Sequence, residues 1–332
     1  MNMKITVVGG GSWGLALSKV LSDNQHQVLV YDVNEKIVNK INDLHICLQL
    51  NEDIPKDIKA TTNIKEAMEF SDVLLFVVPT KVLRIAIKDA LPHIKGEKLI
   101  INAAKGIEPS TFLRISEIFD EMIPSEFLKG FVALSGPSHA EEVIRGNTTL
   151  ITASSDKLEN ALFVQELFHN SDYFRVYTST DLKGSELGGA LKNVFALASG
   201  ILAGRGLGDN ARAALITRGL YEMSKFYKAY GADVKSITGL TGIGDLVVTC
   251  TSPHSRNYQA GFKIGNGKDL EETLNSMTMV VEGIRTCEAA YLFAKDNNVD
   301  APIIDAVYDV VFNKMNPEKV AKRLLGRSVK SE

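Results

Sequence analysis

Cysteine is scarce in this sequence of 332 residues, and its spacing excludes two kinds of protein. The three cysteines, Cys47, Cys250 and Cys287, lie far apart, and no C-x-x-C pair occurs. A disulfide framework needs paired cysteines, and a structural zinc site needs closely spaced ligands. We therefore expect a protein of a reducing compartment, with no disulfide framework and no bound metal.

An excess of charge is also lacking. The 37 basic and 40 acidic residues leave a formal net charge of −3. Nucleic-acid binding requires a basic surface, so a nucleic-acid partner is not expected. The first apolar run begins at Met3, which leaves no room for a signal peptide before it. These features predict a cytoplasmic protein.

A convincing membrane span is lacking as well. The stretch from Leu187 to Gly204 is eighteen residues long with Lys192 as its only charge. It is rich in glycine and is interrupted by Lys192 and Asn193, which argues against a membrane span. Its large apolar residues share one helical face and the rest are mostly small, which predicts a helix buried on most sides.

The most informative feature that is present is the first turn. An apolar run over residues 3–8 leads into Gly9, Gly11 and Gly14, and a helical pattern follows. This is the G-x-G-x-x-G pattern in its required context of strand, turn and helix. Gly9 permits the turn, Gly11 lets a pyrophosphate approach the backbone, and Gly14 lets the helix pack on the strand. Asp32 ends the next apolar run, 18 residues after Gly14, where a carboxylate can bind the adenosine ribose. The turn therefore predicts a dinucleotide site.

The chain divides by its patterns into two parts. Over residues 1–180, short apolar runs alternate with helical patterns, which predicts an α/β Rossmann domain with a doubly wound parallel sheet. Further strands are expected at residues 73–78, 98–103, 131–134, 150–153 and 174–177. Ligands of such sheets bind beyond the carboxyl ends of the strands. Residues 181–332 show helical spacing, which predicts an all-helical second domain.

Lys192 is the candidate for proton transfer. When the sequence is projected on a helix at about 100° per residue, Lys192 lies on the flank of the apolar face. Partial removal from water lowers the pKa of a lysine toward the range useful for proton transfer. The alternative is a lysine whose ammonium group extends into solvent. The helix pattern alone favours neither interpretation.

A second glycine-rich turn precedes Asp245 and leads to a set of small polar residues around Ser255, Arg256 and Asn257. This composition suits a phosphorylated polyol, because arginine presents a planar fork of donors to phosphate, and serine and asparagine add directed hydrogen bonds. The alternative is a loop held by its own side chains in Asx-turns.

These motifs, taken in order, resemble the NAD(P)-dependent glycerol-3-phosphate dehydrogenases of the bacterial type over essentially the whole chain. The resemblance rests on residues 9–14 as GGGSWG, 105–106, 135–138, 192–193, 210–212, 242–246, 255–257 and 281–283. It implies that dihydroxyacetone phosphate and sn-glycerol 3-phosphate interconvert by hydride transfer with NAD(P)(H), supplying glycerol 3-phosphate for glycerophospholipid synthesis. It also implies a homodimer.

The resemblance implies roles for single residues. Lys192 looks like the general acid and base, and Asp245 matches the position that orients this lysine and the substrate hydroxyl. The substrate-contacting positions are matched by Lys105, Gly136, Ser138, Lys192, Asn193, Asp245, Ser255, Arg256 and Asn257. The cofactor-contacting positions are matched by Gly9, Gly11, Ser12, Trp13, Gly14, Asp32, Lys105, Ala140, Arg256, Val280 and Glu282.

One departure from the family concerns the cofactor. After the second strand many relatives carry a basic residue, whereas here Tyr31 and Asp32 are followed by Val33 and Asn34. A 2′-phosphate would face Asp32 without a cationic partner, and such a contact is costly. We therefore expect NAD(H) to be preferred, with NADP(H) as the alternative.

Two other interpretations fit the broad pattern. Another two-domain reductase, of the 2-hydroxyacid, β-hydroxyacid or ketopantoate type, also places a lysine on the first long helix of the second domain. A non-catalytic NAD-sensing module needs the glycine turn without a buried Lys192 or Asp245. The phosphate-binding set at Ser255, Arg256 and Asn257 favours the glycerol-3-phosphate dehydrogenase.

Overall fold

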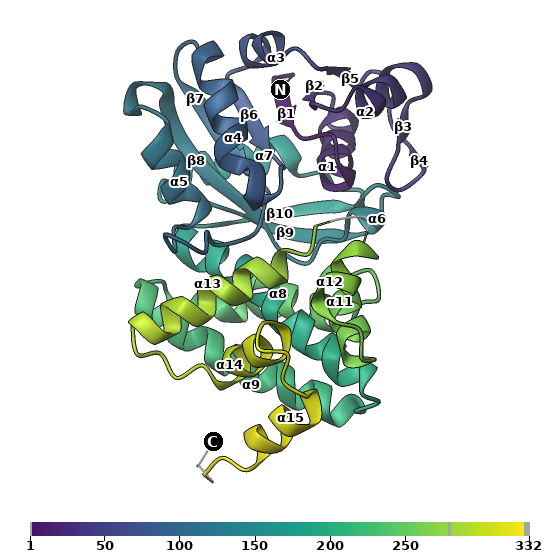
Figure 1. Ribbon diagram of the computed structural model, residues 1–332. Coiled ribbons are helices and arrows are strands. Elements are labelled where there is room, and N and C mark those ends of the chain that lie inside the picture. The colour runs from purple at the N-terminus through teal and green to yellow at the C-terminus, as the bar shows by residue number, and fades with distance from the viewer. Residues whose placement is uncertain (1, 278–279, 329–332) are drawn as a thin grey trace. The chain divides into compact units, whose positions relative to one another are not determined.

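The computed structural model describes residues 2–277 and 280–328, and its contacts divide the chain into two compact units (Figure 1). Met1–Lys105 and Arg114–Glu186 form the first unit, and Gly106–Leu113 and Leu187–Glu332 form the second. This division differs from the expected one, at residues 180 and 181, in two ways. The boundary lies inside a helix, and a segment of eight residues, Gly106–Leu113, belongs to the second unit, where Ile107 is buried in the core.

The first unit is built on an eight-stranded sheet with the order β10-β9-β8-β7-β6-β1-β2-β5. Neighbouring strands are parallel except β8 and β9, which are antiparallel. The strands are β1 (Lys4–Val8), β2 (Gln27–Tyr31), β5 (Lys59–Thr61), β6 (Val73–Phe76), β7 (Lys98–Asn102), β8 (Leu128–Ser135), β9 (Thr149–Ser154) and β10 (Phe174–Ser179). The expected Rossmann sheet is confirmed, and every expected apolar run overlaps a strand, although the runs at 73–78 and 98–103 extend beyond β6 and β7.

Three short strands were not expected from the sequence. They are β5 at the edge of the sheet and the hairpin of β3 (Ile46–Cys47) and β4 (Glu52–Asp53). Each has two or three residues, which is too short to show an apolar alternation. The helices of this unit are α1 (Ser12–Asp23), α2 (Glu35–Asn39), α3 (Ile64–Phe70), α4 (Thr80–Ala90), α5 (Ile115–Met122), α6 (Ala140–Val143) and α7 (Leu158–Phe168).

Residues 187–277 and 280–328 of the second unit form helices joined by turns, as expected, whereas the Gly106–Leu113 segment of this unit contains no helix. Its first helix, α8, begins in the first unit, and the turns before α10 are a 3₁₀ helix (Val234–Thr238) and a π-helical turn (Leu240–Gly244). The helices are α8 (Leu182–Gly204), α9 (Asp209–Tyr230), α10 (Asp245–Thr251), α11 (Arg256–Gly265), α12 (Leu270–Asn275), α13 (Glu282–Asp296), α14 (Pro302–Val311) and α15 (Pro317–Leu325).

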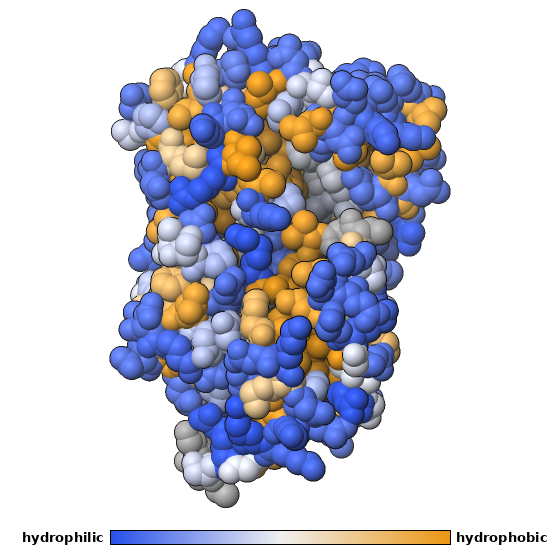
Figure 2. Space-filling view, viewed as in Figure 1, coloured by the Kyte–Doolittle hydropathy of each residue, from blue (hydrophilic) through white to orange (hydrophobic). Residues whose placement is uncertain are grey.

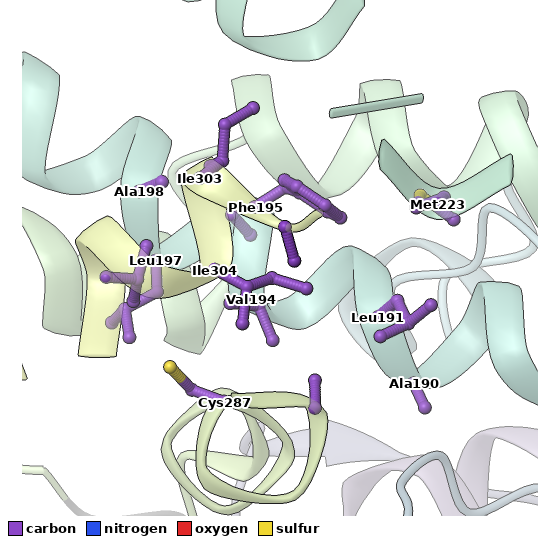
Figure 3. Close-up of a cluster of buried hydrophobic side chains, with 14 of the residues drawn as sticks. Ala190, Leu191, Val194, Phe195, Leu197, Ala198, Met223, Cys287, Ile303 and Ile304 are labelled. Carbon is purple, nitrogen blue, oxygen red and sulfur yellow. The ribbon is translucent and has the colours of Figure 1, made fainter. Parts of the chain in front are cut away.

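Helix α8 forms the centre of the second unit's core (Figure 3). Leu191, Val194 and Phe195 are fully buried, and side chains such as Cys287 and Ile304 pack around them. Among the described residues, α8 is the one helix long and apolar enough to cross a membrane, and 83% of its most apolar window is buried within the protein. Such burial is expected of a core helix. The visible face in Figure 2 is mostly hydrophilic, with apolar residues scattered over it.

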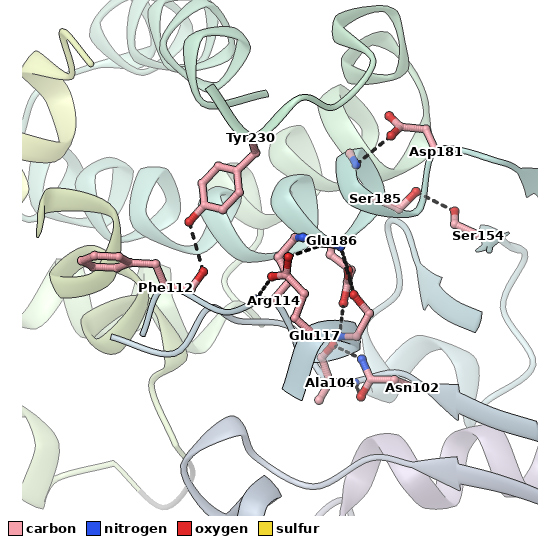
Figure 4. A network of polar contacts seen from close by, with 12 residues as sticks. Asn102, Ala104, Phe112, Arg114, Glu117, Ser154, Asp181, Ser185, Glu186 and Tyr230 are labelled. Atoms are coloured by element: carbon pink, nitrogen blue, oxygen red, sulfur yellow. Dashed lines mark hydrogen bonds and ion pairs between the residues drawn. The ribbon is translucent and has the colours of Figure 1, made fainter. Parts of the chain in front are cut away.

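A buried ion pair joins two points of the first unit where the chain leaves or re-enters it (Figure 4). Arg114 is the first residue after the Gly106–Leu113 segment, and its guanidinium donates to the Glu186 carboxylate at 2.5 Å. Ser116 donates to the same carboxylate from its amide at 2.8 Å and its hydroxyl at 2.6 Å. Both carboxylate oxygens are therefore hydrogen-bonded, which offsets much of the cost of burying the charge.

The Gly106–Leu113 segment has its own anchor within the second unit. Phe112 adopts a left-handed backbone conformation with φ of 60°. Its carbonyl oxygen accepts a hydrogen bond from the Tyr230 hydroxyl at 3.3 Å (Figure 4). Its ring packs edge-on against that of Phe293. These contacts, together with the burial of Ile107, hold the segment on the helical unit.

Candidate active site and cofactor site

The glycine turn has the geometry that a dinucleotide needs. Gly9 has φ of 115°, which favours glycine, and its amide donates to the Tyr31 carbonyl at 2.8 Å. A Cβ on Gly14 would lie 2.0 Å from the Gly9 carbonyl oxygen, so α1 can pack this closely on the turn only with glycine there. A Cβ on Gly11 would meet nothing within 4 Å, so this position opens onto space.

The start of α1 is suited to anion binding. Gly11 is the residue that precedes the helix and has no side chain with which to cap it. The first amides of a helix point toward its N-terminal end, where together with the helix dipole they can bind phosphate oxygens. Ser12 and Trp13, the first two residues of α1, are half-buried. The turn thus fits the pyrophosphate of a dinucleotide.

Asp32 is held directly beside the glycine turn. One carboxylate oxygen accepts from the Gly10 amide at 2.7 Å, and the other accepts from the Asn34 amide at 2.9 Å. Two amides therefore fix its carboxylate just beyond β2. A carboxylate oxygen accepts more than one hydrogen bond, so the group can still accept from a ribose hydroxyl.

A second cluster lies beyond the ends of β7 and β8, also in the first unit. The carbonyl oxygen of Gly136 accepts from the Lys105 ammonium at 3.1 Å and from the Ser138 hydroxyl at 3.0 Å. Gly136 has φ of 145°, and a Cβ there would lie 3.0 Å from the backbone of Ile151. The structure therefore brings Lys105, Gly136 and Ser138 together, and Ala140 follows as the first residue of α6.

The second unit contains a buried lysine with two polar partners from one short helix. Lys192 on α8 is 7% exposed, and its ammonium donates to the Asp245 carboxylate and, at 2.9 Å, to the Thr249 hydroxyl. Asp245 is fully buried at the start of α10. The alternative of a lysine extending into solvent is therefore wrong. Burial raises the pKa of the neighbouring Cys250 thiol to about 12, which leaves this thiol neutral.

The second glycine-rich turn serves the placement of Asp245. A Cβ on Gly242 would lie 2.0 Å from the carbonyl oxygen of Ile237, and one on Gly188 would lie 2.2 Å from that of Thr241. A side chain at Gly188 would push the turn away from α8, whereas one at Gly242 would clash with the preceding 3₁₀ helix. Close approach of these backbones carries Asp245 to Lys192, so the glycines have a packing role here.

Ser255, Arg256 and Asn257 begin α11 rather than forming a loop. Ser255 caps the helix, because its hydroxyl oxygen accepts from the Tyr258 amide at 3.2 Å. Arg256 is exposed and Asn257 is buried. The interpretation as a loop held by Asx-turns is therefore wrong. Arg256 is the first residue of a helix of ten residues, and the positive end of a helix dipole also favours anions.

Helices α8 and α11 lie in unusually close contact. A Cβ on Gly261 would lie 2.0 Å from the carbonyl oxygen of Leu197, and one on Gly265 would lie 2.4 Å from that of Ile201. Both contacts join residues 64 positions apart, so the two helices run in the same direction. The Asn193–Asn257 pair continues this register with a hydrogen bond of 2.8 Å.

Sequence analysis did not single out Thr249, which the structure places in contact with Lys192. Its signal was its position four residues after Asp245 on one helix, which puts both side chains on the same face. The remaining cofactor candidates of the second unit, Val280 and Glu282, lie just before and at the start of α13. Within the described part of the chain, no group of histidine, cysteine or acidic residues could hold a metal ion.

Comparison with known proteins gives the family. The model of the N-terminal domain of NAD-dependent glycerol-3-phosphate dehydrogenases matches residues 4–161, and the model of the C-terminal domain matches residues 181–322. The chain belongs to the NAD-dependent glycerol-3-phosphate dehydrogenase family. This membership argues against both alternative interpretations. They were a different two-domain reductase and a non-catalytic NAD-sensing module.

Relatives of this dehydrogenase family match the chain from end to end. The glycerol-3-phosphate dehydrogenase, NAD(P)+, of Staphylococcus haemolyticus is 50% identical over 331 residues, which is 99% of each chain. That of Staphylococcus carnosus is 48% identical with the same coverage. The crystal structure of the enzyme from Coxiella burnetii is 31% identical, has a TM-score of 0.91 and covers 98% of this chain and 99% of its own. The protein is therefore an NAD(P)-dependent oxidoreductase that interconverts dihydroxyacetone phosphate and glycerol 3-phosphate.

Proposed function

We propose that Lys192 is the general acid and base of this reaction, and that Asp245 and Thr249 hold its ammonium in place. The observation that carries the proposal is the buried contact of Lys192 with both residues. When bound, the reduced nicotinamide supplies a hydride to the carbonyl carbon. Lys192 gives a proton to the carbonyl oxygen, and in the reverse direction it accepts the proton of the hydroxyl group.

The charge that develops during reduction of the ketone favours proton donation by the Lys192 ammonium. Hydride arrival builds negative charge on the carbonyl oxygen, so a fixed ammonium binds the transition state more strongly than the neutral ketone. The Asp245 carboxylate stabilises the ammonium form and limits its rotation. A side chain already held by two partners pays little further ordering cost when substrate binds.

We assign the substrate phosphate to Arg256, since its exposed guanidinium stands at the start of α11. The other proposed substrate contacts are Lys105, Gly136, Ser138, Asn193, Ser255 and Asn257. Lys105 and Arg256 are also assigned to the cofactor.

We also infer that NAD(H) is the preferred cofactor, bound through Gly9, Gly11, Ser12, Trp13, Gly14, Asp32, Ala140, Val280 and Glu282. The fixed carboxylate of Asp32 supports this preference, because it accepts from ribose hydroxyls and repels a 2′-phosphate. The hydrogen bonds that the Gly10 and Asn34 amides donate to Asp32 keep its carboxylate from turning away from a phosphate.

One set of assays tests these assignments. The absorbance of reduced cofactor is followed with dihydroxyacetone phosphate and with dihydroxyacetone, each with NADH and with NADPH at fixed ionic strength. We expect a higher kcat/KM with the phosphorylated ketone and with NADH. A clear preference for NADPH would contradict the role of Asp32, and equal use of the unphosphorylated ketone would contradict the role of Arg256.

For the wider setting, we propose a cytoplasmic homodimer that supplies glycerol 3-phosphate for glycerophospholipid synthesis. The free, buried state of Cys47, Cys250 and Cys287 supports a reducing compartment. Light scattering on the purified protein tests the dimer, with a mass of twice 36.3 kDa as the expected result. Depletion of the enzyme in its cell is expected to lower the glycerol 3-phosphate pool.

A further inference from the structure

The side chain of Asn257 links its own helix, α11, to two other helices of the second unit. Its amide nitrogen donates to the side-chain oxygen of Asn193 at 2.8 Å, and its own oxygen accepts from the Gly283 amide at 2.8 Å. Asn193 and Asn257 are 5% and 8% exposed, and Gly283 is buried. This short chain of hydrogen bonds therefore connects α8, α11 and α13 inside the protein.

Each of the three residues directly follows a residue of the proposed site. Asn193 follows Lys192, Asn257 follows Arg256, and Gly283 follows Glu282. The proton donor, the phosphate ligand and a cofactor contact thus each lie one residue from the same hydrogen-bonded junction.

The junction is also sterically tight. A Cβ on Gly283 would lie 2.7 Å from the carbonyl oxygen of Asn193 and 2.8 Å from the side-chain oxygen of Asn257. Gly283 has an ordinary backbone conformation, so the need for glycine here comes from the close approach alone. The glycine contacts of α8 with Gly261 and Gly265 hold the two helices at the same register.

The chemistry of the junction suits a carboxamide. Asn257 must donate to one neighbour and accept from the other, and a carboxamide offers both on one short, planar group. An aspartate would present an oxygen to the oxygen of Asn193, and an apolar residue would leave the Gly283 amide without its partner. The buried position makes either loss costly.

We propose that Asn257 is a positioning residue, whose carboxamide fixes Lys192, Arg256 and Glu282 relative to one another within the second unit. The inference rests on the proposed function, which assigns those three residues to the site. It adds a role to the substrate contact assigned to Asn257 above. A small displacement between a proton donor and a phosphate ligand reduces the rate strongly, because both must engage one substrate at the same time.

The test disturbs the junction from two sides. Asn257→Ala removes the hydrogen bonds, whereas Gly283→Ala changes no polar group and pushes the same backbones apart. We expect both variants to lower kcat for dihydroxyacetone phosphate about tenfold or more, with a smaller change in KM. Asn160→Ala in the first unit is the matched control, because Asn160 is equally buried at 8% and lies outside the proposed site. Asn257→Ser, which leaves room for a bridging water, replaces Asn257→Ala should that variant not fold.

Two results would overturn the inference. The first is a raised KM in Asn257→Ala with kcat unchanged and Gly283→Ala at wild-type values, which would make Asn257 a substrate contact only. The second is wild-type kinetics in both variants. Lys192→Met is assayed beside them: if it retains turnover, the proposed function fails, whereas its loss of turnover together with unaffected Asn257 variants contradicts this inference alone.

Discussion

The ammonium of Lys192 is bound to the carboxylate of Asp245, a residue 53 positions later in the sequence, and both side chains are buried. A buried ion pair gains from attraction only when the geometry is good and further hydrogen bonds satisfy the groups. Thr249 supplies one such bond. For a reductase, this arrangement presents a fixed positive charge at a place that is largely shielded from water.

Thr249 is expected to contribute to the rate through its hydrogen bond to Lys192. Thr249→Val removes an acceptor of the ammonium, and bonds to charged groups are worth about 1.5–3 kcal/mol. We expect kcat to fall about tenfold or more, and Thr249→Ser to retain most of the activity. Thr251→Val is the control, since the Thr251 hydroxyl donates to a carbonyl of the same helix but is exposed. A wild-type kcat in Thr249→Val would remove Thr249 from the site.

The open position of Gly11 allows nucleotide binding to be tested without harm to the fold. Gly11→Ala adds a methyl group that meets no protein atom within 4 Å, yet it stands where a pyrophosphate is expected. We expect the Kd for NADH, measured by fluorescence, to rise about tenfold or more, with an unchanged Tm.

Gly208 provides a closely matched control for this change. It also precedes a helix, α9, in an extended conformation, and a Cβ there also meets nothing within 4 Å. Gly208→Ala is therefore expected to leave both Tm and NADH affinity unchanged. Gly14→Ala, whose Cβ would clash with the Gly9 carbonyl, is expected to lower stability by about 1–3 kcal/mol. NADH binding at wild-type affinity by Gly11→Ala would contradict the proposed cofactor site.

Glu222 predicts a pH dependence of stability that is separate from catalysis. Burial raises its pKa to about 7, although its carboxylate accepts hydrogen bonds from the amides of Ile303 and Ile304 at 2.9 Å each. Between the pKa that Glu222 has in the unfolded chain and about pH 7, this carboxyl group is protonated in the folded protein and ionised in the unfolded chain. The carboxyl group's stabilising contribution is therefore present at low pH and is lost as the pH rises toward and through 7.

The measurement is the free energy of unfolding by urea between pH 5 and pH 8. We expect the difference between the wild type and Glu222→Gln to change by about 2 kcal/mol over this range, against the wild type as pH rises. Glu222→Gln removes the titration but keeps the size of the side chain. A difference that stays constant with pH, or that changes in the opposite direction, would show that folding does not raise the pKa of Glu222.

Most of the first unit could be predicted from local patterns. Buried parallel strands appear as short apolar runs, and the run over residues 73–78 corresponds to β6 at Val73–Phe76. Gly9 and Gly14 have the turn and packing roles that their spacing indicates, and the pyrophosphate contact of Gly11 stays a prediction. The two-residue strands β3 and β4 could not be predicted, because two residues carry no periodicity.

Local residue patterns alone did not give the partners of Lys192: Asp245 was expected only from the family resemblance, and Thr249 was not expected. The burial of Lys192 depends on Asp245 and Thr249 in another helix, and the helical pattern of α8 left two interpretations open. The assignment of Gly106–Leu113 to the second unit likewise depends on tertiary packing of Ile107 and Phe112. Neither the pairing of distant helices nor the unit to which a loop belongs is encoded in local periodicity.

The most direct test of the account compares two buried lysines. Lys192→Met and Lys98→Met each remove the ammonium of a lysine that is less than 10% exposed. Lys98 is the first residue of β7, and its ammonium donates hydrogen bonds to the Ser71 carbonyl and the Asp72 carboxylate. The account predicts that kcat falls about 10²–10⁴-fold in Lys192→Met with an unchanged Kd for NADH, and that Lys98→Met keeps its kcat. Wild-type turnover by folded Lys192→Met would contradict the central claim that Lys192 moves the proton.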